Sequence, residues 1–157
     1  MNSNGFLTWN LELVSKALNI TSEEAIEYFT DGRRVSFVLE RRISKEIVKG
    51  KLASSEGASY DLLDKDGKKW EVRSITKSGI YFCPSYMVGS KRSFEEYGFL
   101  LKLDEIEGYI LSDVELFPNV PYWIINKNIV HRWWKEGHLG TNTKISREKA
   151  LRLLKSI

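Results

Sequence analysis

The sequence has little cysteine, little proline and no long apolar run, and each shortage excludes a class of protein. A single cysteine, Cys83, excludes disulfides within the chain and zinc sites built from several cysteines, so we expect a reducing, cytoplasmic location. Three prolines and 11 glycines exclude collagen-like and low-complexity chains. No apolar run approaches the roughly 18 residues of a membrane span, and no signal-peptide pattern opens the chain. We therefore expect a soluble intracellular protein with no membrane partner.

Length and composition are those of one globular domain. A chain of 157 residues, 42% hydrophobic and 29% charged, can bury a core but is short for two domains. Its net charge is +3, and the excess is uneven: 127–157 holds eight basic residues against two acids, 31–51 seven against three, and 89–117 three against seven. Two basic blocks around an acidic segment suit a polyanion such as nucleic acid, although solvated helix faces give the same pattern.

Hydrophobic periodicity predicts helices at both ends of the chain and strands between them. Helical spacing predicts helices within 1–50, at 94–104, at 128–136 and after Ser146. A period of two predicts strands at 60–64, 68–75, 108–114 and 122–125. The expected fold is one α/β (α+β) domain with a mixed sheet flanked by helices. It comprises a helical part (1–50), a sheet core (51–145) and a C-terminal helix (146–157).

The hairpin at 60–73 carries the most informative residues, and its register decides which face each one occupies. A two-residue turn at Asp66-Gly67 would mix apolar and charged groups on both faces. A three-residue loop with Gly67 in the left-handed conformation shifts the register by one. One face then gathers Tyr60, Leu62, Trp70 and Val72, and the other gathers Asp61, Lys69, Glu71 and Arg73. Because burial of the apolar set decides register, we favour the second arrangement.

In this register Asp61 lies directly opposite Glu71. Carboxylates placed so lie about 5 Å apart at Cβ, close enough to share a hard cation such as Mg²⁺. Arg73 points the same way from the same strand and can neutralise charge that develops on a phosphoryl group. A surface hairpin with ordinary cross-strand ion pairs is the alternative interpretation of the same residues.

Asp61, followed ten residues later by Glu71-Val72-Arg73, resembles the signature of the PD-(D/E)XK nuclease superfamily, an acid and then acid-x-lysine across a hairpin. The length of the chain is also similar to that of type II restriction endonucleases, remotely the PvuII-like group. The resemblance covers about residues 54–150. The further residues that carry it are Glu56-Gly57 and the tail residues His138, Asn142, Lys144 and Ile145.

The resemblance implies a restriction-endonuclease-like fold with a Mg²⁺ site at which Mn²⁺ can substitute. It makes Glu56, Asp61, Glu71 and Arg73 catalytic residues. Asp61, Glu71 and the Val72 carbonyl would bind the metal, which activates water for in-line attack on the phosphodiester.

Arg73 stands where the family usually has lysine. Arginine stays charged at any working pH and cannot serve as a base. If an ammonium group is required, Lys69 or Lys77 could supply it.

The resemblance also implies that the segment after the second strand enters the major groove. Hydroxyl and cationic side chains suit contacts to phosphates and base edges. The DNA-binding candidates are Lys77, Ser78, Tyr81, Ser85, Tyr86, Lys91, Arg92, His138, Asn142 and Lys144.

We therefore expect a Mg²⁺-dependent endonuclease for double-stranded DNA, a site-specific type II enzyme of a restriction-modification system. Cutting both strands with one site per chain implies a homodimer on a palindromic target, with the N-terminal helices at its interface. The alternatives are a repair or junction-resolving nuclease, a catalytically lapsed DNA-binding domain, and a protein-interaction module.

Overall fold

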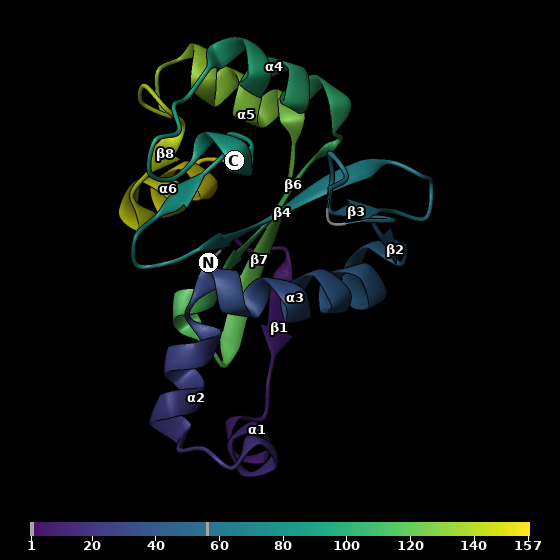
Figure 1. The fold of residues 1–157 in the computed structure, drawn as a ribbon, viewed down its shortest axis with the longest axis vertical. Helices are drawn as coiled ribbons and strands as arrows, with labels where there is room; N and C mark the ends of the chain where they lie inside the picture. The colour runs from purple at the N-terminus through teal and green to yellow at the C-terminus, as the bar shows by residue number, and fades with distance from the viewer. Residues whose placement is uncertain (1, 56) are drawn as a thin grey trace.

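A mixed sheet of six strands lies at the centre of the molecule, with helices on both faces (Figure 1). The computed structural model describes residues 2–55 and 57–157. Across the sheet the strands are ordered β1-β7-β6-β4-β3-β2. Strands β4 and β6 are parallel, and the other neighbouring pairs are antiparallel. This arrangement confirms the expected α/β class with a mixed sheet flanked by helices.

The strands of this sheet are β1 (Gly5–Thr8), β2 (Lys51–Leu52), β3 (Leu62–Leu63), β4 (Lys69–Ile75), β6 (Gly108–Asp113) and β7 (Asn119–Asn126). A second sheet pairs β5 (Ile80–Tyr81) with β8 (Lys144–Ile145). The helices are α1 (Leu11–Leu18), α2 (Ser22–Phe29), α3 (Gly32–Ile43), α4 (Glu96–Glu105), α5 (Lys127–Lys135) and α6 (Arg147–Lys155). A π-helical turn, η1 (Ser44–Val48), and two 3-10 turns, η2 (Ser85–Met87) and η3 (Val114–Leu116), are the other helical segments among the described residues.

Helix α3 covers one face of the sheet through an apolar stripe. Its buried residues, Val35, Leu39 and Ile43, recur every four positions, as the sequence predicts. They belong to one buried cluster with Leu62 and Val72 of the β3–β4 hairpin, which we call the α3-side cluster. The helix is therefore packed against the hairpin that carries the expected site.

Residues 1–50 are not helical throughout, in contrast to the expectation from the sequence. Strand β1 pairs antiparallel with β7 at the edge of the sheet and buries Leu7 while exposing Phe6. Phe6 and Leu7 are adjacent apolar residues, so this segment does not show the alternation that indicates a strand. The expected capping box at Thr21 and Glu24 does begin α2.

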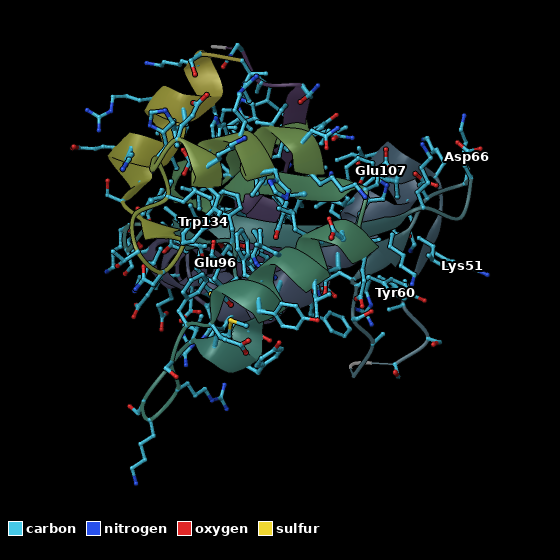
Figure 2. The ribbon with its side chains drawn as sticks, turned by 90° about the horizontal axis from the view of Figure 1, so that it is seen from above. Lys51, Tyr60, Asp66, Glu96, Glu107 and Trp134 are labelled. Atoms are coloured by element: carbon cyan, nitrogen blue, oxygen red, sulfur yellow. The ribbon has the colours of Figure 1, made fainter. Side chains whose placement is uncertain are left out.

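Helices α4, α5 and α6 cover the opposite face of the sheet. Their buried side chains join those of β4, β6 and β7 in a second cluster, which we call the α4-side cluster; the helical members include Phe99, Leu103, Val130, Trp133, Ala150 and Leu154. Trp134 Nε1 of α5 donates a hydrogen bond to Glu96 Oε1 of α4 at 3.0 Å, which ties the two helices together (Figure 2). Helix α4 belongs to the connection between the parallel strands β4 and β6, and so returns over the sheet.

In the described part of the chain, none of the helices combines the length and the apolar character required to cross a bilayer.

Candidate active site

The β3–β4 hairpin has the register that the apolar pattern predicts. Leu62 pairs with Trp70. The loop spans 65–67: the Gly67 N–H donates to the Asp64 carbonyl at 3.0 Å, and Gly67 has a φ of 79°. This confirms the three-residue loop with a left-handed glycine, a conformation that a residue with a Cβ adopts only at a cost.

A β-bulge at Asp61 changes the course of the chain before the strand. Trp70 pairs with Leu62, yet its carbonyl accepts the Asp61 N–H at 3.0 Å, so two residues of one strand face one residue of the other. Beyond the bulge Tyr60 packs against the α4-side cluster, with the Lys69 ammonium 5.3 Å from its ring centre. The expectations that Tyr60 shares the apolar face of Leu62 and Trp70 and that Asp61 lies directly opposite Glu71 are both wrong. The bulge shifts the alternation of side chains by one residue, so Asp61 and Leu62 together face Trp70.

The Asp61 side chain continues the pairing that the bulge interrupts. Its Oδ2 accepts a hydrogen bond from the Val72 N–H at 2.8 Å. Since the N–H and C=O of a strand residue point to the same side, the Val72 carbonyl lies on this side as well, where it accepts a hydrogen bond from Arg73 Nη1 at 3.5 Å. A carboxylate and a backbone carbonyl, two hard oxygen donors, are therefore neighbours at the edge of β4.

Glu71 is buried and bound by two cations. Arg73 Nη1 lies 2.7 Å from its Oε2, and Lys102 Nζ of α4 lies 2.5 Å from its Oε1. Arg73 also donates from Nη2 to the Cys83 carbonyl at 3.2 Å, and its guanidinium lies 5.0 Å from the centre of the Tyr81 ring. Burial alone would lower the pKa of Arg73, but the Glu71 carboxylate opposes it, and the net pKa lies above its usual range.

Three acids share this region. Burial, followed by repulsion from Glu71, raises the pKa of Asp61 to about 6. Burial, followed by repulsion from Asp61, raises the pKa of Glu40 in α3 to about 7. When all are ionised, these three carboxylates exceed the two cations Arg73 and Lys102 by one negative charge.

Glu40 and Lys102 are site residues that the sequence reasoning missed. Each comes from a helix, and the element that a helix faces is set by packing rather than by local pattern. Signals exist nevertheless: Glu40 follows the core residue Leu39 on a helix otherwise rich in arginine, and Lys102 interrupts the run Leu100-Leu101-Lys102-Leu103. An ionic residue inside an apolar run is a candidate for a buried partner.

An open groove of about 620 Å³ adjoins the acids. Glu40 and Arg33 line it from α3, and Asp61 and Arg73 line it from the hairpin. The remaining lining comes chiefly from the segment after β4, together with residues at the junction of α2 and α3 and Lys144 of β8. It includes half of the DNA-binding candidates, namely Lys77, Ser78, Tyr81, Ser85 and Lys144.

The other five DNA-binding candidates do not line this groove. Arg92 bonds the Ser85 and Val88 carbonyls, His138 lies 3.2 Å from Glu136, and the Asn142 side chain accepts the Lys144 N–H. Tyr86 and Lys91 are exposed. Glu56, expected as a catalytic acid, lies outside the described residues.

The oxygen donors at the site have the chemistry that a hard divalent cation prefers, but they do not form a ready-made cluster for one. Within 2–55 and 57–157, no three His, Cys, Asp or Glu side chains form a group that could hold a metal ion. The Glu71 oxygens bind Arg73 and Lys102 instead. However, Asp61 and the Val72 carbonyl offer the oxygen ligands that Mg²⁺ prefers, and the surplus negative charge favours an added cation.

Comparison of the chain with protein-family models, with curated proteins and with solved structures found no match. What the protein does is therefore inferred from the chemistry of the site, because a fold class alone does not determine function.

Proposed function

We propose that the protein is a Mg²⁺-dependent endonuclease that cleaves double-stranded DNA. The proposal rests on one observation. Three acids, Glu40, Asp61 and Glu71, lie close to one another and to Arg73, and an open groove with basic residues in its lining adjoins them. Carboxylates suit a divalent metal, and the basic side chains Arg33, Lys77 and Lys144 in the groove lining suit a phosphate backbone. The hairpin signature that resembles PD-(D/E)XK nucleases points to the same chemistry.

Each residue of the site has a role in this proposal. Asp61, Glu71 and the Val72 carbonyl would hold the metal, which when bound supplies Lewis-acid activation of the phosphodiester. Arg73 places a permanent positive charge beside the groove, where it stabilises charge that develops on the phosphoryl oxygens. Glu40, with a pKa of about 7, can accept a proton near neutral pH.

The groove would bind the DNA backbone through its basic lining. Arg33 comes from the first turn of α3, Lys77 from the connection after β4, and Lys144 from β8. Three cations from separate segments of the chain can each neutralise a phosphate along one strand.

A type II enzyme would act as a homodimer, because two sites are needed to cut both strands. We place the second copy against the N-terminal helices, which carry the exposed apolar residues Leu13, Leu18, Ile26 and Phe37. Helices α1 and α2 project from the sheet, away from α4 and α5 (Figure 1).

The test is incubation of supercoiled plasmid with the protein in Mg²⁺, in Mn²⁺ and in EDTA. We expect discrete fragments with either metal and none in EDTA. Glu71→Gln should abolish cleavage, whereas Glu136→Gln, a surface acid paired with His138, should leave it unchanged. Nicking without discrete fragments would favour a repair or junction-resolving nuclease.

A catalytically lapsed DNA-binding domain is the second candidate. The observation in its favour is Glu71, whose two oxygens are both neutralised by cations of the chain itself. This domain would shift labelled DNA at low salt but bind no Ca²⁺ in calorimetry and cut nothing in Mg²⁺ or Mn²⁺. Absence of both binding and cleavage would overturn both candidates.

A further inference from the structure

Helix α4 brings a lysine to the acid that the nuclease signature places on β4. Lys102 Nζ lies 2.5 Å from Glu71 Oε1, and the two side chains are 13% and 5% exposed. A buried ammonium without an anion nearby would be costly, so Lys102 stays beside the acids of the site. Phe99 and Leu103, fully buried in the same helix, fix the position from which Lys102 reaches the sheet.

We propose that Lys102 is a positioning residue of the proposed nuclease and supplies, from α4, the ammonium group that the signature usually carries on the strand. This inference rests on the proposed function. It replaces the expectation that Lys69 or Lys77 supplies the group, because Lys69 is exposed beside the Tyr60 ring and Lys77 lines the groove rather than pairing with Glu71.

Arg73 and Lys102 have different roles toward the two oxygens of the Glu71 carboxylate. Arg73 is held in place by the Cys83 carbonyl and the Tyr81 ring as well as by Glu71 Oε2, so it fixes the orientation of the carboxylate. Lys102 has a flexible stem and a compact charge, so it can release Oε1 when a metal ion requires that oxygen. The ammonium would then remain beside the site as a mobile positive charge.

This division predicts opposite changes in metal affinity and in cleavage. Without Lys102, Oε1 is free and one repelling charge is gone, so Ca²⁺ should bind about 10-fold more tightly to Lys102→Met. Cleavage at saturating Mg²⁺ should nevertheless fall about 100-fold, because the positive charge is lost from the site. A residue that merely packs α4 in place would weaken both together.

Two further variants separate charge from packing. Lys102→Arg keeps the charge and should retain the Ca²⁺ affinity of the wild type. In the double variant Arg73→Lys with Lys102→Met, a lysine stands on the strand, and cleavage should recover about 10-fold over Lys102→Met. The control is Lys127→Met: Lys127 Nζ holds the Asp104 carbonyl of α4 at 3.1 Å but pairs with none of the site acids.

Ca²⁺ affinity is measured by calorimetry, cleavage on plasmid, and folding by thermal melting. Tighter Ca²⁺ binding with slower cleavage in Lys102→Met, and rescue by the double variant, support the inference. Cleavage equal to that of the wild type, or a joint loss of melting temperature, Ca²⁺ binding and cleavage, overturns it. If the wild-type protein binds no Ca²⁺ and cuts no DNA, the proposed nuclease function itself is overturned. This outcome is seen with the wild type alone, before any variant is compared.

Discussion

Asp61 and Val72 are joined by a side-chain-to-backbone hydrogen bond of 2.8 Å at the position where β3 departs from β4. The carboxylate thus takes the place of a neighbouring strand's carbonyl. One residue therefore completes the backbone bonding of β4 and at the same time presents acidic oxygens beside Glu71 and the groove.

Asp61→Asn should separate these two tasks. An asparagine Oδ1 can still accept the Val72 N–H, so the fold should persist, while the charge needed for a metal is lost. We expect plasmid cleavage to fall about 100- to 1,000-fold. The matched control is Asp66→Asn, an exposed acid at the outer tip of the same hairpin (Figure 2), which should cleave as the wild type does. Equal cleavage by Asp61→Asn and wild type would exclude Asp61 from the site.

The stability of the metal-free protein should fall as pH rises through the range in which its buried acids ionise. Asp61 has a pKa of about 6 and Glu40 of about 7, each above its ordinary value because burial and neighbouring acids disfavour the charge. The folded state therefore binds protons more tightly than the unfolded state does. These two groups stabilise the fold fully below about pH 4 and lose that contribution as pH rises to about 7.

Urea titrations from pH 4 to 8 in EDTA measure this effect. The loss due to the two acids should total on the order of 5 kcal/mol, because each pKa is raised by roughly two units, one unit is worth about 1.4 kcal/mol, and water screens part of the contribution of the half-buried Glu40. The double variant Glu40→Gln with Asp61→Asn should lack this part of the pH dependence, and Ca²⁺ should restore stability to the wild type at pH 7. A double variant with an unchanged pH profile would contradict the assignment.

Glu40→Gln tests the acid that α3 contributes. If Glu40 accepts a proton near neutral pH, its amide should slow cleavage about 10- to 100-fold with little change in DNA affinity. Glu46→Gln is the control from the following turn η1, where the acid pairs with Arg42. Single-turnover cleavage assays measure the rate. Equal rates for both variants would remove Glu40 from the chemistry.

The groove cations should govern the salt dependence of DNA binding. Lys77→Ala and Lys144→Ala should each weaken binding and reduce the slope of log K against log salt by about 1, because one phosphate contact is lost. Lys91→Ala, outside the groove, should leave the slope unchanged. Fluorescence anisotropy at salt concentrations between about 50 and 200 mM measures the DNA affinity of all three variants. A reduced slope only for Lys91→Ala would place the DNA elsewhere.

Gly67 tests the loop that sets the hairpin register. Its φ of 79° lies in the left-handed region, while nothing lies within 4 Å of the position of an added Cβ. Gly67→Ala should therefore cost about 1 kcal/mol of unfolding free energy through backbone strain alone. Gly137→Ala, with the same φ and equally open space, should cost a similar amount without touching the hairpin. Only Gly67→Ala should also lower cleavage.

The sequence was sufficient for the features that local pattern determines. The register of Leu62 against Trp70 follows from burial of apolar residues and from a glycine at the left-handed position. The stripe of α3 follows from residues spaced four apart. Tyr60 was misplaced because a single extra residue in a strand leaves no periodic trace.

The site itself was only partly predictable, because it joins segments that are distant in the chain. Asp61, Glu71 and Arg73 belong to one hairpin, and their spacing brings them together. Glu40 and Lys102 arrive on helices packed against opposite faces of the sheet. Which helix residue meets the hairpin depends on tertiary packing, which one sequence does not specify position by position.

The parallel pairing of β4 with β6 has a consequence for synthesis of the chain. The strand that supplies Glu71 is bonded along its whole length to residues of β6, which leave the ribosome after α4 has been made. Contacts so far apart in sequence form late, after the cost of closing a long loop has been met. A truncated chain that ends before Gly108 would keep the β3–β4 hairpin residues but would lack the parallel neighbour of β4, so the strand that carries Glu71 and Arg73 would be supported on one side only.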